Sequence, residues 1–238
     1  MSPSSSNNIM QSLNASLLSE FNIAETLLKT LREEFVAKFY GVKTVNGYDY
    51  LELDRIGSKI FTKNIINNMH NTYNTTNIIS TADIKIGKVT YDPLASEAKK
   101  SRSNKWECLP VLGYQYLGIK RNDEKLIDKS FCRGLKIDEI YKVHEQFLPE
   151  VKCERSLETR QKVVEKILVK IDAIIEWFDE QKSLQFYGSS LLVIYNSETC
   201  EAEVKMIDFA HVFYEAGKTD ENYLFGIRNL RDAFYEYL

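Results

Sequence analysis

The stretch Thr81–Pro93, TADIKIGKVTYDP, holds the residues of this sequence whose types and spacing best suit chemistry. Asp83 and Lys85 alternate with Ile84 and Ile86, so an extended backbone places both charged side chains on one face and both isoleucines on the other. An amphipathic strand would show the same alternation. The pattern therefore predicts a strand with an aspartate beside a lysine, without assigning a reaction to them.

A dense basic segment follows that strand. From residue 85 to residue 105 there are six basic and two acidic residues, a local charge of +4 in a chain whose formal net charge is -3. The basic residues are Lys85, Lys88, Lys99, Lys100, Arg102 and Lys105. Lys99 and Arg102 are three residues apart and would share one face of a helix. A solvated basic face explains the segment as well as the alternative, a pocket in which several cations converge on a compact polyanion.

Asp208 marks a second candidate site. Two predicted strands, Ser189–Tyr195 and Glu203–Asp208, are joined by a turn, and antiparallel pairing would bring Ser189 and Ser190 opposite Asp208. A carboxylate at a strand end, near hydroxyl groups, suits a divalent cation with oxygen ligands. An aspartate that only caps the next turn is the more frequent explanation of such a position.

Composition and missing motifs exclude several classes of protein. The sequence pI of about 5.8 argues against a general nucleic-acid binder. No GxxxxGK, GxGxxG or HRD motif occurs, which disfavours P-loop enzymes and ordinary protein kinases. The four cysteines are scattered and no zinc-ligand spacing occurs, so we expect four buried free thiols in a reducing compartment. No apolar run of about 18 residues and no signal peptide is present, which favours the cytoplasm, with the nucleus as the other compartment that fits.

The elements that must position these residues alternate between helix and strand. With 238 residues and 44% hydrophobic content, the chain can bury the core of one large domain or of two lobes that share a cleft. Asn46 and Gly47 are typical of the turn of a hairpin between Val42–Val45 and Tyr48–Leu53. Two more strands are expected at Ile78–Ile86 and Val111–Ile119. Helices are expected at Phe21–Tyr40, Asn64–Asn77, Leu94–Trp106, Lys136–Phe147, Leu157–Lys182 behind a Ser156 cap, and Tyr223–Leu238.

Three ordered segments carry a resemblance to a known family. DIKIGKVTYDPLAS, FYGSSLLVIYN and VKMIDFAHVF resemble the inositol polyphosphate kinases, whose hallmarks are PxxxDxKxG, SSLL and IDFAH stretches in that order. The CRGL run and the late YLFGIRNL also look like this family, so the resemblance extends from Glu20 to the C-terminus. The motifs look closest to inositol polyphosphate multikinases, and inositol hexakisphosphate kinases, which make pyrophosphates, share them with variations.

The resemblance implies an α+β, two-lobed, protein-kinase-like fold with a reduced N-lobe. On this basis residues 1–20 are a polar N-terminal segment and residues 21–238 a single catalytic domain, with an N-lobe over about 21–54 and a C-lobe over about 55–238. The implied substrates are ATP, bound between the lobes with Mg²⁺, and a soluble inositol phosphate beside it. We expect no nucleic acid, no membrane span and no obligate protein partner.

The resemblance also implies roles for individual residues. Asp83 would orient or deprotonate the attacking hydroxyl, Lys85 would neutralise phosphate charge, and Asp208 would hold Mg²⁺, supported indirectly by Ser190. Backbone groups of Glu52 and Leu53 would contact adenine and Asp54 the ribose. The inositol phosphate pocket would comprise Lys85, Lys88, Lys99, Lys100 and Arg102. His211 would contact the substrate, although a single histidine in a turn is more often structural.

Two departures from the family pattern keep an alternative open. Ile79 stands where the family has a proline, which changes a backbone restraint more than the chemistry. The family's early strands bear a lysine that binds ATP phosphates, whereas Lys29 and Lys38 fall on a predicted helix. The first alternative to a kinase is a catalytically weak protein that binds inositol phosphates or phosphoinositide headgroups. The second alternative, which the sequence favours least, is a protein whose basic helix docks on acidic partners.

Overall fold

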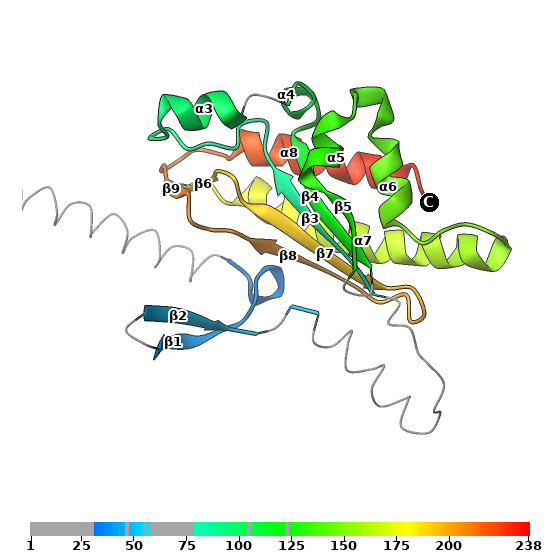
Figure 1. Cartoon of the computed structure of the whole chain (residues 1–238). Coiled ribbons are helices and arrows are strands. Elements are labelled where there is room, and N and C mark those ends of the chain that lie inside the picture. The colour runs from blue at the N-terminus through cyan, green and yellow to red at the C-terminus, as the bar shows by residue number, and fades with distance from the viewer. Residues whose placement is uncertain (1–30, 46–47, 55, 58–78, 104–105, 122–123) are drawn as a thin grey trace, which may run out of the picture.

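The central feature of the fold is a five-stranded antiparallel sheet with the order β5-β4-β3-β7-β8 (Figure 1). The computed structural model describes residues 31–45, 48–54, 56–57, 79–103, 106–121 and 124–238. The strands are β3 (Ile79–Ile86), β4 (Tyr114–Arg121), β5 (Glu124–Asp128), β7 (Ser190–Asn196) and β8 (Ala202–Ile207). Strand β3 is hydrogen-bonded on both sides, so its register sets the positions of its neighbours.

Strand β3 is amphipathic, as the sequence predicts. Ala82, Ile84 and Ile86 are fully buried on one face, while Asp83 and Lys85 are half-buried on the other. The bulge between Asp83 and Ile84 in the pairing with β4 leaves this alternation intact. The charged pair of β3 therefore lies on the sheet face opposite to the hydrophobic core.

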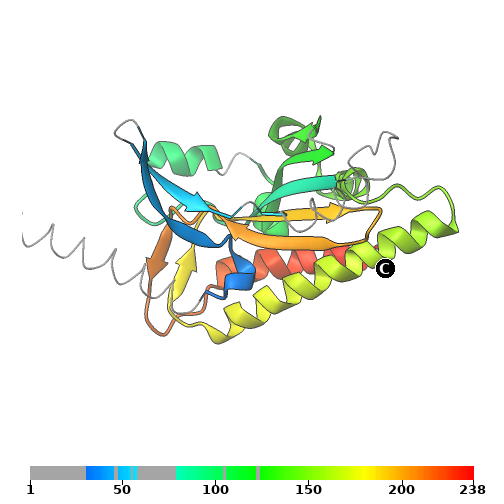
Figure 2. The same ribbon diagram turned by 90° about the horizontal axis from the view of Figure 1, so that it is seen from below.

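Two long helices cover the apolar face of the sheet. Helices α7 (Glu154–Glu180) and α8 (Glu221–Tyr235) lie side by side beneath the strands (Figure 2). Phe178 of α7 stacks on Tyr223 of α8 with ring centroids 4.3 Å apart and packs edge-on against Phe186 at 5.3 Å. The helices thus join the sheet through one continuous aromatic and aliphatic core.

Shorter elements surround this core. Helices α3 (Glu97–Ser103) and α4 (Leu109–Leu112) follow β3, and α5 (Lys129–Gly134), η2 (Ile137–Glu139) and α6 (Tyr141–Phe147) follow β5. Strands β6 (Leu184–Phe186) and β9 (Val212–Tyr214) form a separate two-stranded sheet. The β4 strand begins at Tyr114, three residues after the predicted start, because Val111 belongs to α4, which ends at the left-handed Gly113. Elements α4, β5, α5, β6 and β9 were not predicted.

The N-terminal part of the described chain is a hairpin. Strands β1 (Phe39–Val45) and β2 (Tyr48–Leu53) pair antiparallel, which confirms the predicted hairpin, and Figure 1 shows them apart from the main sheet, next to β8. The predicted helix over 21–40 is wrong for residues 31–40, which contain only the 3₁₀ turn η1 (Glu33–Phe35) and the start of β1. Phe35 is buried against Trp177, so tertiary packing overrides the helical pattern there. Residues 21–30, the Asn46-Gly47 turn and the predicted helix over 64–77 lie outside the described residues.

Helix α7 starts earlier than predicted, and its cap differs. Cys153 is the N-cap, and Ser156 lies inside the first turn with its Oγ accepting a hydrogen bond from the Cys153 backbone N–H at 2.9 Å.

Cys108 and Cys132 are buried free thiols, whereas Cys153 is exposed, which corrects the expectation that all four are buried. Hydrogen bonds from the Ser156 backbone and side chain lower the pKa of Cys153. Among the described residues, no helix is long and apolar enough to cross a membrane.

Helix α8 approaches the sheet closely at Gly226. A Cβ on Gly226 would lie 2.0 Å from the Gly113 carbonyl oxygen and 2.8 Å from the Gly87 nitrogen, both backbone atoms that cannot move aside cheaply. We expect Gly226→Ala to lower the free energy of unfolding by about 3 kcal/mol through overpacking. Gly134→Ala is the matched control, since no heavy atom lies within 4 Å of its Cβ position. Urea unfolding would measure both, and equal small effects would contradict this packing.

His144 of α6 is a buried neutral histidine. Its Nε2 lies 3.2 Å from the Tyr114 hydroxyl and its Nδ1 3.3 Å from the Tyr116 hydroxyl. Burial lowers the pKa of His144 from 6.5 to about 4. The neutral ring therefore stabilises the fold above pH 6.5, and this contribution is lost as the pH falls towards 4.

We expect the free energy of unfolding to fall by about 2 kcal/mol more in the wild-type chain than in His144→Gln between pH 7 and pH 5. The glutamine keeps polar contacts with the two tyrosines and does not titrate. Denaturant unfolding at both pH values would measure the difference. Parallel losses in the two proteins would mean that the ring is not held neutral by burial.

Candidate active site

The candidate site is built on one row of cross-strand neighbours. Lys85 of β3 pairs with Gln115 of β4 on one side and with Ser190 of β7 on the other, and Ser190 pairs with Ile207 of β8. Directly paired residues of antiparallel strands project from the same face, so Gln115, Lys85 and Ser190 share the face of Asp83. Asp208 follows Ile207 at once. The sheet thus gathers residues that are more than 120 positions apart in the sequence.

Unpartnered polar atoms concentrate at this row. In the part of the chain that the structure describes, six buried side-chain nitrogen or oxygen atoms have no hydrogen-bond partner, and three of them are Asp83 Oδ1, Gln115 Nε2 and Ser190 Oγ. Buried polar groups are otherwise nearly always hydrogen-bonded. A carboxylate oxygen, an amide donor and a hydroxyl without partners at neighbouring positions indicate a surface preorganised for a polar ligand.

The electrostatics of the row couple Asp83, Lys85 and Asp208. Burial raises the pKa of Asp83, the nearby Ser190 hydroxyl opposes this rise, and the charge of Asp208 adds to it. Burial lowers the pKa of Lys85, while the carboxylates of Asp208 and Asp83 oppose that change. The structure therefore brings together Asp83, Lys85, Ser190 and Asp208, the four residues to which the sequence hypothesis assigns catalytic and metal roles.

The backbone at Asp208 adopts an unusual conformation. Its φ is 65°, in the left-handed region that aspartate tolerates better than most residues, and Ser189 Oγ donates a hydrogen bond to the Asp208 carbonyl oxygen at 2.9 Å. This turn leaves the Asp208 side chain exposed at the end of β8. The carboxylate is consequently fixed at its backbone yet accessible to a ligand.

The position of the Lys85 side chain also depends on a nearby glycine. Gly188 has a φ of 71°, and a Cβ there would lie 3.0 Å from the Thr90 carbonyl oxygen and 3.6 Å from Lys85 Nζ. The missing side chain lets both the Thr90 carbonyl oxygen and the Lys85 ammonium group lie close to the Gly188 backbone. Any larger residue would strain the backbone and crowd the lysine.

Helix α5 supplies two cations that sequence reasoning missed. Burial lowers the pKa of Lys129, and the positive charges of Arg133 and Lys85 lower it further, while Asp83 opposes the change. Arg133 also lowers the pKa of Lys85. Asp128 caps the helix by accepting hydrogen bonds from the backbone N–H groups of Ser130 and Phe131. The CRGL run was the available signal, but nothing in it indicated that α5 packs against β4 and β5, from where its charges act on Lys85.

The predicted basic pocket is only partly assembled by α3. Lys99 lowers the pKa of Lys85, so its charge reaches the row. Lys100 instead pairs with Glu97 at 2.7 Å, and Arg102 Nε donates to the Ala98 carbonyl oxygen at 3.2 Å on the exposed surface. Lys88 lies with Nζ 4.2 Å from the ring centroid of Phe225. The structure thus places Lys99 near enough for its charge to act on Lys85, with its Nζ 3.2 Å from Asp92 Oδ2, and directs the other three towards neighbours outside the row.

The loop that carries Lys88 is fixed by α8. Asn222 Oδ1 accepts a hydrogen bond from the Val89 N–H at 2.8 Å, and its Nδ2 donates to the Val89 carbonyl oxygen at 3.0 Å. His211 lies in the turn between β8 and β9, half-exposed, with Nδ1 3.1 Å from Asp92 Oδ2. His211 therefore contacts the part of the chain that leads from β3 into α3.

The predicted adenine and ribose contacts lie on the hairpin. Glu52 and Leu53 end β2, paired with Gly41 and Phe39, and the Asp54 N–H donates to the Lys38 carbonyl oxygen at 2.7 Å. Asp54 is exposed where the chain leaves the hairpin. Lys38 lies directly before β1 and not on a helix, with Nζ 5.3 Å from the Tyr40 ring centroid.

The donor set of the site limits what metal it could hold. Within the described ranges, no group of three or more His, Cys, Asp or Glu residues is close enough to enclose a metal ion. Asp208 offers one exposed carboxylate. Mg²⁺ is commonly bound by one or two carboxylates with substrate phosphates and waters completing its shell, so Asp208 fits a metal that arrives with a phosphate ligand.

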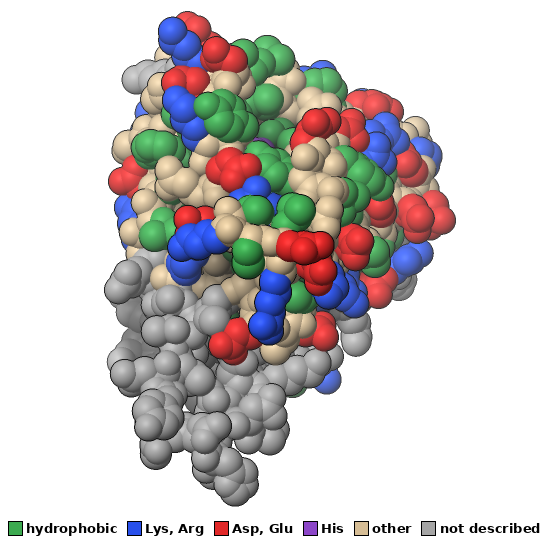
Figure 3. Space-filling view, turned by 90° about the vertical axis from the view of Figure 1, so that its right-hand side faces the viewer, with side chains coloured by type: hydrophobic (Ala, Val, Ile, Leu, Met, Phe, Trp, Pro, Cys, Tyr) green, Lys and Arg blue, Asp and Glu red, His purple; other side chains and the backbone are tan. Residues whose placement is uncertain are grey.

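The opposite end of the molecule differs from the site. Figure 3 shows acidic and basic side chains interspersed among hydrophobic ones on the end that carries α6 and the start of α7. A cavity of about 240 Å³ lies at that end and is lined by Ser80, Arg121, Pro149, Glu150, Ser156, Thr159, Tyr195 and Ser197. It has one arginine and one glutamate, a balanced charge that does not suit a polyanion.

Comparison with known proteins assigns the family. The inositol polyphosphate kinase family matches residues 64–235, most of the chain. The chain belongs to the inositol polyphosphate kinase family. The inositol polyphosphate multikinase of Mus musculus is 27% identical over 194 residues, which cover 78% of this chain and 43% of that protein. The inositol hexakisphosphate kinase 3 of Mus musculus is 28% identical over 182 residues, covering 62% and 44%. The chain spans less than half the length of these relatives.

Solved structures confirm the fold. The inositol phosphate multikinase Ipk2 of S. cerevisiae, in complex with ADP and Mn²⁺, superposes with a TM-score of 0.69 at 18% identity, covering 92% of this chain and 95% of that one. A second inositol phosphate multikinase structure gives a TM-score of 0.64 at 21% identity. The α+β, kinase-like fold expected from the sequence is thereby confirmed.

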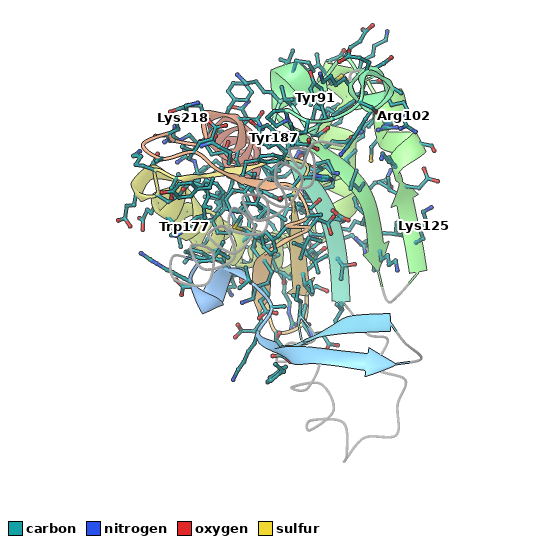
Figure 4. All side chains as sticks on the ribbon, turned by 90° about the vertical axis from the view of Figure 1, so that its left-hand side faces the viewer. Tyr91, Arg102, Lys125, Trp177, Tyr187 and Lys218 are labelled. Carbon is teal, nitrogen blue, oxygen red and sulfur yellow. The ribbon has the colours of Figure 1, made fainter. Side chains whose placement is uncertain are left out.

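The convergence of Lys129 and Arg133 on Lys85 predicts polyanion binding. We expect Lys129→Gln to weaken binding of inorganic triphosphate about tenfold, because it removes one charge from a partly buried cluster. Lys125→Gln is the matched control, since Lys125 lies at the outer edge of the sheet (Figure 4) and pairs with Asp128 at 3.3 Å. Isothermal titration calorimetry at fixed ionic strength would compare them. Equal affinities for the two variants would contradict the role of α5.

Proposed function

We propose that this chain is an ATP-dependent inositol polyphosphate kinase that transfers the γ-phosphoryl group of ATP to a hydroxyl or phosphate of a soluble inositol phosphate. The observation that carries the proposal is the polar face of β3, on which Asp83, whose buried Oδ1 has no hydrogen-bond partner, lies two residues from Lys85 and both respond to the charge of Asp208. Family membership and the names of the relatives support it.

In this proposal Asp83 acts on the attacking hydroxyl. Its unpartnered Oδ1 accepts the hydroxyl hydrogen bond, orients the oxygen towards the γ-phosphorus and takes its proton as the new bond forms. Lys85 places its ammonium beside that oxygen and neutralises the charge of the transferred phosphoryl group. Phosphoryl transfer depends mainly on positioning and charge neutralisation, and a rigid central strand provides both.

The remaining residues hold the two substrates. Asp208 would bind Mg²⁺, which neutralises the phosphates of ATP when bound, and Ser190 would support it indirectly. The likeness to a structure with ADP and Mn²⁺ supports this assignment. Lys99, Lys129 and Arg133 would hold substrate phosphates, with Lys88, Lys100 and Arg102 at the rim. Glu52, Leu53 and Asp54 would contact the nucleoside from the hairpin.

The relatives support two kinds of activity within this reaction class. Multikinases and hexakisphosphate kinases match the chain at similar identities, 26% to 27% and 27% to 29% respectively. A multikinase phosphorylates hydroxyls of a partly phosphorylated ring, whereas a hexakisphosphate kinase extends an existing phosphate to a pyrophosphate. We propose multikinase-like activity, hexakisphosphate kinase activity, or both, in the cytoplasm or nucleus.

The test is turnover with Mg-ATP and inositol trisphosphate, pentakisphosphate or hexakisphosphate, with products separated by charge. We expect a more highly charged product from at least one of them. Asp83→Asn should lower kcat at least about a hundredfold through loss of the proton acceptor. Asp208→Asn should abolish turnover yet leave inositol phosphate binding intact, and asparagine also tolerates the left-handed backbone at that position.

Controls separate chemistry from folding and from the binding-protein alternative. Asp179→Asn removes a surface ion pair with Arg228 and should leave turnover unchanged. Loss of folding in Asp208→Asn would remove the metal role from that residue. Tight inositol phosphate binding without product from any substrate, and ATP binding that does not depend on Mg²⁺, would favour a binding protein over a kinase.

A further inference from the structure

Strand β8 carries two charged side chains on the sheet face that holds the candidate site. Lys205 of β8 pairs with Leu192 of β7, which pairs with Asp83 of β3, so these three residues form one cross-strand row and share a face. Glu203 lies two residues before Lys205 and projects from the same face. Both charged side chains are half-buried, and both reach the chain segments that flank the hairpin.

The two side chains bind the two ends of the hairpin separately. Lys205 Nζ donates a hydrogen bond at 2.6 Å to the carbonyl oxygen of Glu34, in the turn η1 before β1, and the next residue, Phe35, is buried in the core. Glu203 Oε2 accepts a hydrogen bond at 2.6 Å from the N–H of Gly57, which follows β2. One strand of the main sheet therefore binds both the segment that enters the hairpin and the segment that leaves it (Figure 1).

The segment that leaves the hairpin also packs on the face of Asp83. Ile56 and Leu192 both pack against a pair of buried isoleucines, Ile79 of β3 and Ile194 of β7. Leu192 is the cross-strand neighbour of Asp83, and Ile79 projects from the same face of β3 as Asp83 does. The end of the hairpin is consequently tied to the sheet close to the proposed catalytic carboxylate.

The hydrogen bonds add a restraint that the apolar contacts lack. Burial of apolar surface is non-directional, so the contacts of Phe35 and Ile56 keep the two segments at the sheet without fixing the direction of the hairpin between them. Hydrogen bonds depend on angle as well as distance, and those made by charged groups are stronger than neutral ones. Lys205 and Glu203 supply one such bond at each end of the hairpin.

We infer that Glu203 and Lys205 are positioning residues for the nucleotide: they fix the hairpin relative to the polar face of the sheet, so that nucleoside contacts and phosphate contacts meet on one bound molecule. This inference rests on the proposed function, which places the nucleoside contacts at Glu52, Leu53 and Asp54. A polyphosphate without a nucleoside makes no use of the hairpin. ATP and inorganic triphosphate are therefore the two ligands that reveal this role.

The first test compares the Kd values of these two ligands for the full chain, each with Mg²⁺, by isothermal titration calorimetry. We expect Glu203→Ala and Lys205→Met each to weaken ATP binding about tenfold, because the hairpin then takes the binding orientation in only about a tenth of the molecules. The Kd of inorganic triphosphate should change less than about twofold. An unchanged affinity for ATP, or equal losses for the two ligands, would overturn the inference.

Conservative variants separate the hydrogen bonds from a general effect of charge. Glu203→Gln keeps an acceptor for the Gly57 N–H and Lys205→Arg keeps a donor for the Glu34 carbonyl oxygen, so both should retain ATP affinity within about threefold of the wild-type value. Lys120→Met is the matched control: Lys120 is exposed on the same sheet face, but on β4, which lies across β3 from β8. A tenfold loss in Lys120→Met would contradict a role that depends on contact with the hairpin.

A distance measurement without ligand distinguishes this inference from the proposed function. Spin labels at Tyr40→Cys on the hairpin and Val169→Cys on α7 would occupy exposed positions, in a chain whose two accessible cysteines are replaced in Cys153→Ser and Cys200→Ser. We expect one narrow distribution of label distances, and a broader one when both charged side chains of β8 are replaced. An unchanged distribution would refute the inference. Absence of ATP binding or of turnover in the wild-type chain would instead count against the proposed function.

Discussion

The pairing of β3 with a strand on each side is the constraint on which the rest of the structure depends. A central antiparallel strand cannot shift by one residue without exposing Ile84 and burying Lys85, because alternate side chains face opposite sides. The apolar face of the sheet packs against α7 and α8, and this packing fixes the register of the polar face as well. The free energy of burying the core thus also fixes Asp83 and Lys85 relative to Ser190 and the turn at Asp208.

The positions of the site residues follow from two kinds of support. Residues on β3, β4 and β7 are fixed by the hydrogen bonds of the central sheet. Lys129 lies instead on a short helix, and His211 lies in a turn outside the central sheet, where its carbonyl oxygen accepts a hydrogen bond from the Tyr187 N–H. Preorganised groups cost little to align when a ligand arrives. The sheet therefore supplies the groups that react, and the surrounding elements supply charge that can adjust to the shape of an anion.

The sequence predicted what depends on local pattern and missed what depends on long-range packing. The alternation at Asp83 and Lys85, the hairpin and the meeting of Ser189 with Asp208 all follow from periodicity and pairing rules. Lys129 and Gln115 could not be found in this way. The packing of α5 against the sheet, which places Lys129, leaves no periodic signal in the sequence, and neither does the pairing of Gln115 with Lys85 on the neighbouring strand. The helix predicted over residues 21–40 failed in its described part for the same reason: burial of Phe35 against Trp177 decides the backbone there.

The contrast among the cysteines has a practical consequence. Cys153 is exposed at the N-cap of α7 with a lowered pKa, while Cys108 and Cys132 are buried. Thiolates are the reactive form, so a maleimide dye would modify Cys153 in preference to the two buried thiols. Because α7 is a 27-residue helix whose first turn lies at the end of the molecule away from α3, a fluorophore there could report on tumbling or on surface attachment without entering the site.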